Sequence, residues 1–569
     1  MSFRNIYIVL LFSLLSAPAF AQIPVTRDQI EDAIALRGQA EVLIKYPGRE
    51  LFELINRNLS VSGLREGMAE IVLSADDTAW FFSLELPAYV KEQDSPKSIL
   101  SAMTMEEAMN WDIYPTLQQY DSIMRYFAGS YPDICRLDTI GLTYMGRAVL
   151  ALKISDNVSD EEAEPAVFFT STMHGDELAG FVLLLRLAEY LLESYPSTTL
   201  AGHLVDSLQI WINPLANPDG TYTSYDTPGS RDTILFPTRV NSEGTDLNRS
   251  FPGPLTDQAP DQETNNFIHF QEMNRFTLSV NFHSGEEVIN YPWDTWSAKH
   301  PDDEWFEKIS REWADSVHLV SGEGYMDGFD NGIVRGSVWY EIRGGRQDYV
   351  TWAQHGREVT AEIDKTKLTS GSGLPQLWDY NYRSMLRYAE NAMFGVHGFV
   401  TDAITGKPLK ASVITVNHDL DGSHIVSDSL TGYYIRLIAP GLWDFAFSAD
   451  GYKPDTVYGI SVTEREQLRL SVAMVPLGQD TLPENSRELI LYPVPVADNL
   501  NIMLSDLKEG QGELTIISLQ GQTVLKKIRY FTSGQPVTEN VSHLAPGVYI
   551  CRVILSQGKG SFESLLVRR

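Results

Sequence analysis

The sequence of 569 residues contains only two cysteines, Cys135 and Cys551, and they lie far apart. This excludes a disulfide scaffold and a zinc site built from cysteines, so any metal must be held by histidines and carboxylates. Basic residues are also few, because 44 Lys and Arg stand against 75 Asp and Glu, which gives a formal net charge of -31. An acidic surface repels phosphate backbones, which argues against nucleic acid as a partner.

Long apolar runs are absent except near the N-terminus, where residues 6–15 follow the basic Arg4. The small residues Ala19 and Ala21 then flank Phe20. This pattern predicts a secretory signal peptide over residues 1–21, cleaved after Ala21. A membrane anchor needs about 20 apolar residues, and this run is shorter and breaks at Pro18. We therefore expect an exported chain without a transmembrane anchor.

The rest of the chain divides by its pattern of apolar residues. At about 150 residues per domain, the length predicts about three to four domains. Alternating strand-like and helical runs indicate a small α+β domain, and helices between very apolar strands indicate an α/β domain with a sheet covered on both faces. Short alternating strands broken by Gly and Pro are typical of β-sandwiches. The predicted order is the α+β domain at 22–105, the α/β domain at 110–394, a β-sandwich at 395–476, a polar linker at 477–490 and a second all-β module at 491–569.

Residues suited to metal binding occur in the α/β segment. His174 and Glu177 lie between an apolar strand at 166–170 and a long helix at 178–195, so both side chains can point to one place. Alone, this pair also fits a surface histidine beside a glutamate at a helix start. His283 ends another apolar strand, and sites in α/β sheets gather at the carboxyl ends of strands. Two histidines and one glutamate leave a fourth zinc position open for water, as in catalytic zinc sites.

A second polar cluster lies between these residues in the sequence. Arg239, Asn248 and Arg249 belong to one glycine-containing loop, and two guanidinium groups with an amide can grip a carboxylate. The alternative is an arginine loop that forms ion pairs with Asp219 or Glu243. Glu362 lies in an apolar strand; beside a metal it could act as a general base, and otherwise it could be part of an ion pair or lie at a sheet edge.

Five motifs occur in an order that resembles the zinc carboxypeptidases, most of all the regulatory branch of the carboxypeptidase D, E, M and N type. The resemblance covers about half of the chain. The motifs are His-Gly-Asp-Glu at 174–177, Asn-Pro-Asp-Gly at 217–220, Asp-Leu-Asn-Arg-Ser-Phe-Pro at 246–252, His283 with Tyr-Pro-Trp-Asp at 291–294, and Gly-Gly-Arg-Gln-Asp-Tyr at 344–349.

The resemblance implies a zinc carboxypeptidase fold with a mixed central sheet, preceded by the small α+β domain and followed by two small β-sandwich modules. It implies one Zn²⁺ per chain on His174, Glu177 and His283. It further implies that Glu362 is the general base and that Arg239 polarises the scissile carbonyl.

The resemblance also implies how the substrate binds. Asn248 and Arg249 would hold its terminal carboxylate, and Asp294 and Gln347 would surround a basic side chain. One position departs from the family: the tyrosine that closes over the substrate is replaced by Thr351, while Tyr349 lies two residues earlier. Both residues are therefore candidates for the lid.

The flanking modules resemble known companions of such enzymes. The segment from Gly398, with Thr-Gly-Lys-Pro at 405–408 and Ala-Pro-Gly at 439–441, is similar to the transthyretin-like domain that follows the regulatory carboxypeptidases. Tyr-Pro-Val-Pro at 492–495, with Leu-Ala-Pro-Gly-Val-Tyr at 544–549, resembles the type IX secretion sorting domain. The first domain resembles carboxypeptidase pro-regions in length and pattern.

We therefore expect a secreted or cell-surface zinc carboxypeptidase, exported through the periplasm of a Gram-negative bacterium by the type IX machinery. Its substrates would be the C-termini of peptides or proteins, with a preference for C-terminal Lys or Arg. One alternative is a peptidoglycan stem-peptide amidase on the same fold. Another is a non-catalytic cell-surface binding protein.

Overall fold

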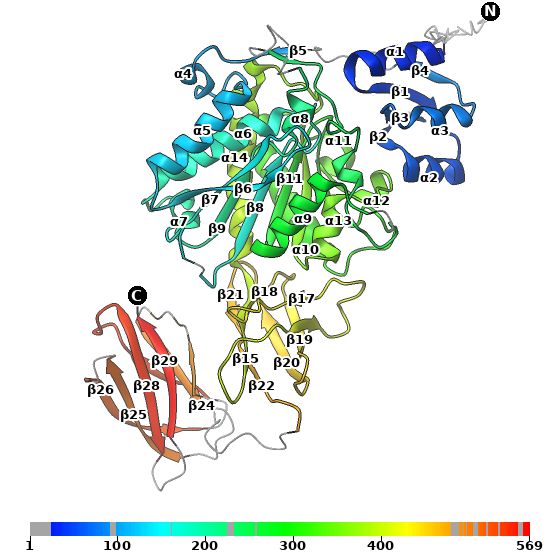
Figure 1. The fold of residues 1–569 in the computed structure, drawn as a ribbon. Helices are drawn as coiled ribbons and strands as arrows, with labels where there is room; N and C mark the ends of the chain where they lie inside the picture. The colour runs from blue at the N-terminus through cyan, green and yellow to red at the C-terminus, as the bar shows by residue number, and fades with distance from the viewer. Residues whose placement is uncertain are drawn as a thin grey trace, which may run out of the picture.

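The computed structural model describes residues 24–65, 67–90, 98–160, 162–224, 233–256, 259–478, 489–492, 494, 496, 498–504, 510–518, 522–532, 535–555 and 561–568. The predicted signal peptide and most of the predicted linker lie outside these residues. Figure 1 shows four units along the chain: a blue N-terminal unit, a large unit from cyan to light green, a yellow β-unit and an orange-red C-terminal unit.

The N-terminal unit is a four-stranded antiparallel sheet with three helices. The strand order is β2-β3-β1-β4. Apolar side chains from strands and helices, such as Ile44, Ile55 and Ile71, form its own core. The elements are α1 (Arg27–Arg37), β1 (Ala40–Lys45), α2 (Arg49–Asn58), β2 (Ser60–Arg65), β3 (Met68–Leu73), α3 (Thr78–Ser83) and β4 (Ala88–Val90).

The large unit is built on an eight-stranded mixed sheet in the order β13-β12-β14-β11-β8-β9-β7-β6. The four central strands β14, β11, β8 and β9 are parallel. Strand β12 pairs antiparallel with β14 and parallel with β13, and β7 and β6 pair antiparallel with their neighbours. The strands are β6 (Cys135–Leu142), β7 (Ala148–Ile154), β8 (Ala166–Ser171), β9 (Gln209–Asn213), β11 (Leu278–His283), β12 (Glu286–Tyr291), β13 (Ile333–Arg335) and β14 (Arg357–Asp364). The apolar strands predicted at 166–170, before His283 and around Glu362 correspond to β8, β11 and β14, and the predicted α/β class with a mixed sheet is confirmed.

Helices cover both faces of this sheet, which is why its central strands β8, β9 and β11 are buried along their whole length. In β8, Val167 and Phe169 pack into one core with α5 (Leu117–Ser130), α6 (Ala179–Ser194), α10 (Asp303–Ser321) and α14 (Leu374–Glu390). The alternate residues Ala166 and Phe168 pack into a second core with α9 (Gln262–Asn274) and α13 (Arg346–Trp352). Short elements complete the unit: α4 (Met105–Ala108), α7 (Leu200–Val205), α8 (Pro218–Thr221), α11 (Gly328–Asn331), α12 (Gly336–Trp339), and β5 (Ser98–Leu100) paired with β10 (Thr233–Leu235).

The yellow unit is a β-sandwich. Strands β15 (Gly395–Asp402), β18 (Tyr433–Arg436), β21 (Gln467–Arg469) and β22 (Val472–Met474) form one sheet. Strands β16 (Ser412–Thr415), β17 (Ile425–Val426), β19 (Gly441–Ser448) and β20 (Asp455–Val462) form the other. A buried ion-pair network joins the sandwich to the large unit, because Asp302 accepts hydrogen bonds from Arg357 at 2.7 Å and from Arg436 at 2.8 Å.

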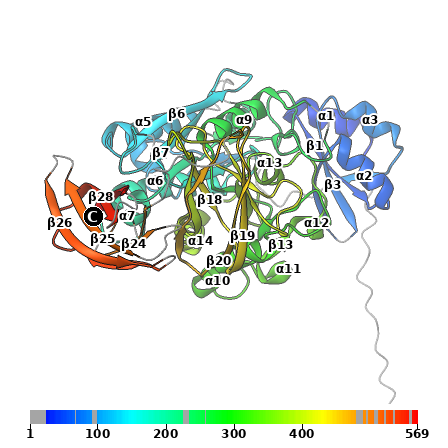
Figure 2. The ribbon, with the colours of Figure 1, turned by 90° about the horizontal axis from the view of Figure 1, so that it is seen from below.

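The C-terminal unit also contains two facing sheets, and Figure 2 shows it at one end of the molecule. Its strands are β23 (Leu489–Tyr492), β24 (Asn499–Leu504) and β27 (Val537–Asn540) in one sheet, and β25 (Gly510–Ser518), β26 (Thr523–Phe531), β28 (Gly547–Leu555) and β29 (Ser561–Arg568) in the other. Residues from both sheets, including Leu500 and Ile516, share one core. Among the residues that the structure describes, no helix has the length and apolar content needed to cross a membrane.

Candidate active site and metal centre

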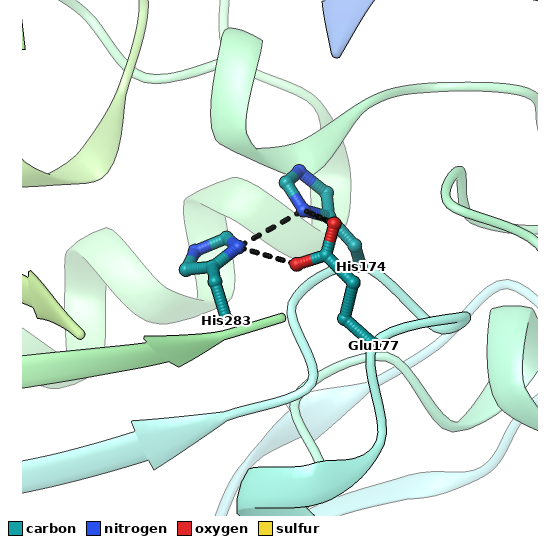
Figure 3. Close-up of side chains that lie close together, drawn as sticks. All are labelled: His174, Glu177 and His283. Atoms are coloured by element: carbon teal, nitrogen blue, oxygen red, sulfur yellow. Dashed lines mark hydrogen bonds and ion pairs between the residues drawn. The ribbon is translucent and has the colours of Figure 1, made fainter. Parts of the chain in front are cut away.

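Two neighbouring parallel strands bring the three predicted metal ligands together. His283 is the last residue of β11, which pairs in parallel with β8. His174 follows the end of β8 after a short loop, and Glu177 lies two residues before the start of α6. Because both strands end at the same edge of the sheet, the three side chains converge, as Figure 3 shows. All three are buried, with exposed fractions of 2–3%.

The three side chains point the atoms that could bind a metal at one place. His283 Nδ1 lies 2.7 Å from Glu177 Oε2 and 3.0 Å from His174 Nδ1. His174 Nδ1 lies 3.0 Å from Glu177 Oε1. Burial lowers the pKa of His283 to about 4, so this ring is neutral, as metal ligation requires. Two imidazole nitrogens and a carboxylate at this spacing fit a tetrahedral zinc site that keeps one position for water.

The outer nitrogens of both rings also have polar neighbours. His174 Nε2 lies 3.1 Å from Asp246 Oδ1, and His283 Nε2 lies 2.8 Å from the side-chain amide of Asn281. A histidine that binds a metal through Nδ1 carries its proton on Nε2 and needs an acceptor there. Asp246 is that acceptor for His174. For His283, the atom nearest Nε2 is Asn281 Nδ2, and Asn281 Oδ1 accepts from the Thr170 hydroxyl at 3.0 Å. With a metal on Nδ1 of His283, the Asn281 amide would have to turn so that its oxygen faces the ring.

Arg239 lies directly beside this centre. Its Nη1 lies 3.2 Å from Glu177 Oε1, and its Nε donates to Asp246 Oδ2 at 2.8 Å. The alternative ion pairs of this loop are not formed, because Asp219 pairs with Arg147 at 3.3 Å instead. Although burial opposes ionisation, the charge of Arg239 holds the pKa of Asp246 well below its usual value. Arg239 is therefore a fixed cation at the edge of the metal site.

Glu362 lies beside the candidate metal ligands. Its strand β14 runs parallel to β11, and the register places Glu362 next to His283. Within the described part of the chain, Glu362 Oε2 is buried without a hydrogen-bond partner. Burial, and after it the charge of Glu177, hold the pKa of Glu362 well above its usual value. A carboxylate whose proton affinity is raised in this way suits a general base.

Asn248 and Arg249 lie in a short 3₁₀ helix, Leu247–Arg249, that Asp246 caps. Asn248 Oδ1 accepts from the backbone N–H of Arg346 at 2.9 Å, which fixes the amide. Arg249 Nη1 donates to Asn248 O at 2.9 Å, and its Nη2 donates to the carbonyl oxygen of Val61 at 2.6 Å. Among the described residues, Arg249 Nε has no partner. One donor of Arg249 is therefore held by the N-terminal unit, and another is free for an acceptor.

The two predicted specificity residues contact each other. Asp294 Oδ1 accepts from Gln347 Nε2 at 3.1 Å and from Asn290 Nδ2 at 3.0 Å. Burial, and after it the carboxylate of Asp348, hold the pKa of Asp294 well above its usual value. Asp294 lines the pocket described next, whereas Gln347 lies behind Asp294 and positions it.

One pocket unites these groups. It has a volume of about 220 Å³ and is lined by the three metal-ligand candidates together with Arg239, Asn248, Arg249, Asp294 and Glu362. Side chains of the N-terminal unit, including Gln39 and Arg65, form its opposite wall. Ser60 of β2 also contacts Arg239 at 3.0 Å. The structure therefore brings all eight residues to one cavity that lies between two units of the chain.

The two lid candidates do not reach this pocket. Tyr349 and Thr351 lie in α13 with exposed fractions of 4% and 0%. The ring of Tyr349 packs on Phe251, with 5.3 Å between the ring centres, and its hydroxyl accepts a hydrogen bond from Gln354. The helical turn of α13 directs Tyr349 into the core below the sheet. In this structure neither residue lies over the metal ligands.

Several residues of the site were not identified from the sequence. Asn281 lies two residues before His283, a position at which both side chains of a strand share one face, so its strand position was a usable signal. Tyr340, which lines the pocket, and the wall formed by the N-terminal unit gave no local signal. These contacts depend on which distant segments the fold brings together.

Comparisons with known proteins agree with the geometry. The zinc carboxypeptidase family matches residues 120–384, a carboxypeptidase regulatory-like domain matches residues 395–475, and a secretion system C-terminal sorting domain matches residues 490–567. Carboxypeptidase D of Rattus norvegicus is 33% identical over 382 residues, which cover 64% of this chain and 27% of that protein. The chain thus spans about a quarter of the length of that relative.

A second relative is matched over most of its length. The carboxypeptidase N catalytic chain of Rattus norvegicus is 31% identical over 384 residues, covering 60% of this chain and 82% of that protein. Among solved structures, the chain is similar to a carboxypeptidase A from Helicoverpa armigera, with 16% identity, a TM-score of 0.46, and coverage of 63% of this chain and 97% of that one. From the extended match to the carboxypeptidase N catalytic chain and from the matching family domain, we conclude that this chain belongs to the zinc carboxypeptidase family.

Proposed function

We propose that this protein is an exported zinc-dependent carboxypeptidase that removes the last residue of peptides, with a preference for Lys or Arg. One observation carries the proposal: a single cavity holds a metal-ligand set, a carboxylate with raised proton affinity, two groups that can bind a terminal carboxylate, and a buried aspartate. The first three are what exopeptidase chemistry needs, and the aspartate would account for the preference for a basic side chain. Their combination in one cavity of 220 Å³ favours a small end group of a peptide as ligand.

Each residue of the pocket has a proposed role that follows from its position. Zinc held by His174, Glu177 and His283 would supply a Lewis acid for the scissile carbonyl and lower the pKa of a water molecule to about 7. Glu362 would take the proton of that water and pass it to the departing amine. Arg239, beside Glu177, would donate to the carbonyl oxygen as negative charge develops on it. Asn248 and Arg249 would hold the terminal carboxylate, which places the last peptide bond at the metal.

The experiment that tests this function is an assay of the purified chain on peptides that differ only in their last residue, with muropeptides in parallel. We expect release of C-terminal Lys or Arg and one zinc per chain. Turnover of muropeptides with intact linear peptides would instead indicate the stem-peptide amidase. Zinc without any turnover would indicate a binding protein that kept the fold.

The contacts of the N-terminal unit with the pocket support the interpretation of residues 22–105 as a pro-region-like domain. We expect this unit to compete with the substrate. The carbonyl oxygen of Val61 occupies Arg249 Nη2, a donor that the terminal carboxylate would use. Arg65 helps to hold the unit in place, through an ion pair of 3.0 Å with Glu286 and a hydrogen bond to the carbonyl oxygen of Gly285.

Replacing Arg65 with Ala should therefore raise the rate of peptide hydrolysis, by about two- to fivefold because an exposed ion pair contributes little. The control is Arg27→Ala, which removes a comparable ion pair with Glu31 inside helix α1. Rates are compared at equal zinc content. An unchanged rate for Arg65→Ala would show that the N-terminal unit does not limit access.

Export is the second part of the proposal. The match of residues 490–567 to a secretion system sorting domain supports type IX export from a Gram-negative cell. Deleting residues 491–569 should leave the enzyme active but retained in the periplasm. Activity is measured in the periplasmic and extracellular fractions of cells that carry the type IX machinery. If both forms distribute alike, the module has another role.

A further inference from the structure

Asp176 lines the same pocket as the candidate metal ligands, and the reaction proposed above does not use it. It directly precedes Glu177 in the chain and is 4% exposed. Its Oδ2 accepts a hydrogen bond from Lys367 Nζ at 3.3 Å. Among the described residues, its Oδ1 is buried and has no hydrogen-bond partner. One oxygen of a buried carboxylate is therefore available to a ligand in the pocket.

The turn that carries Asp176 is held in place on two sides. A Cβ on Gly175 would lie 2.3 Å from the carbonyl carbon of Gly220, so helix α8 packs directly against this turn. On the other side, the backbone N–H of Leu178 donates to the carbonyl oxygen of Lys367 at 3.1 Å. The same backbone bond keeps Lys367 beside Asp176. The carboxylate is thus fixed next to the candidate metal ligands.

Asp176 and Asp294 lie in different parts of the pocket, because they have different charged neighbours. Those that act most strongly on Asp176 are Lys367, Glu177, Glu41 and Arg239, and those that act most strongly on Asp294 are Asp348, Arg249 and Glu358. In the proposed reaction the scissile bond lies at the metal, and the last residue of the substrate extends toward Asp294. Asp176 adjoins the metal site outside that part of the pocket. It is therefore placed near the residue that precedes the scissile bond.

We infer that Asp176 is a specificity residue for the penultimate side chain of the substrate and that it favours Lys or Arg at that position. This inference rests on the proposed carboxypeptidase function. A carboxylate oxygen without a partner binds a cationic N–H donor more strongly than a neutral one. Lys367 uses one of the two oxygens, so a second cation can share the carboxylate. An apolar penultimate side chain would leave Oδ1 buried and unsatisfied, which is costly.

The test uses N-acylated dipeptides that all end in arginine and have lysine, methionine or glutamate before it. Lysine and methionine are unbranched side chains of similar length, so their comparison isolates the charge. We compare kcat/KM for the unchanged full chain, Asp176→Asn, Lys367→Met and Asp303→Asn, with the zinc content measured for each.

Asp303→Asn is the matched control. Asp303 is also buried, with an exposed fraction of 7%, and one of its oxygens contacts Lys299. Its other oxygen has no hydrogen-bond partner among the described residues, as in Asp176. Asp303 begins helix α10 and does not line the pocket. A loss of preference in Asp176→Asn alone would therefore come from the pocket and not from the loss of any buried charge.

For the unchanged chain we expect kcat/KM to be about 3- to 30-fold higher with lysine than with methionine, between the contribution of an exposed ion pair and that of a desolvated one. Glutamate should be the slowest of the three. Asp176→Asn should remove the preference for lysine, and Asp303→Asn should keep it. Lys367→Met should increase it, because both oxygens of Asp176 are then open to the substrate.

Equal rates with lysine and methionine in the unchanged chain, or a preference that Asp176→Asn retains, would overturn the role of Asp176. If Asp176→Asn loses its zinc, Lys367→Met decides, and a preference that stays the same or falls in that variant would overturn the inference. If the zinc-loaded unchanged chain releases arginine from none of the three peptides, the proposed function itself fails.

Discussion

Replacing Glu362 with Gln is expected to lower kcat by about 10²- to 10⁴-fold while zinc stays bound. This range is the usual contribution of a positioned acid or base. Gln keeps the size of the side chain but cannot take a proton from water. The zinc content should not change, because the three ligand atoms that converge belong to His174, Glu177 and His283 and do not include Glu362.

Two further variants serve as controls for this experiment. His283→Ala removes a ligand atom and should lose both zinc and activity. Glu287→Gln removes a carboxylate from the neighbouring strand β12, where Glu287 pairs with Lys365 at 3.0 Å, and should change neither. Elemental analysis and steady-state kinetics are run on the same preparations.

Loss of zinc in Glu362→Gln would reassign Glu362 to the metal ligands. Full activity with zinc bound would mean that another group takes the proton. The two results can be told apart because Glu362 lies on β14, whereas the candidate ligands come from β11 and from the loop and turn after β8.

The central strands and the convergence of the candidate metal ligands could be predicted from the sequence for one physical reason. Strands covered on both faces are buried along their whole length and rich in apolar residues, as β8 and β11 are, and parallel strands end at the same edge of a sheet. Polar residues that directly follow such strands, like His174 and His283, must therefore lie close together. The same reasoning does not apply to β6 and β7, because these two strands pair antiparallel at one edge of the sheet.

What the sequence could not reveal are contacts between distant segments and the direction of side chains in short helices. Val61 and Arg249 are 188 residues apart, and no local pattern marks their hydrogen bond. The motif around Gln347 suggested Tyr349 or Thr351 as a lid, but the turn of α13 directs Tyr349 onto Phe251. Tyr340 lines the pocket at the end of helix α12, a position that depends on the tertiary fold.

The specificity of the proposed enzyme should depend on the charge of Asp294. Its carboxylate is 3% exposed, and no cation neutralises it within the described residues: its side-chain neighbours are the neutral amides of Asn290 and Gln347. Burial raises the pKa of Asp294, which means that the charged form is costly in an empty pocket. A bound Lys or Arg side chain would stabilise the charged form, and an apolar side chain would not.

We therefore expect kcat/KM to be higher for peptides that end in Arg than for those that end in Leu, by roughly thirty- to several thousand-fold. This ratio corresponds to about 2–5 kcal/mol for an unpaired charge in a desolvated pocket. Asp294→Ala should lower kcat/KM for Arg far more than for Leu. Asp294→Asn is the matched control for volume, because it keeps an oxygen that can accept from Asn290 and Gln347 but removes the charge.

The two variants separate charge from shape. If charge selects the substrate, Asp294→Asn should lose the preference for Arg nearly as completely as Asp294→Ala does, with activity on Leu peptides retained. If Asp294 only supports the backbone at Gly336, where an added Cβ would lie 1.7 Å from Asp294 Oδ1, Asp294→Asn should behave as the unchanged chain, and Asp294→Ala should slow both substrates equally. A natural preference for C-terminal Leu or Phe would show that the pocket assignment is wrong. The metal site and the role of Glu362 would stand in that case, because neither depends on which side chain occupies the Asp294 end of the pocket.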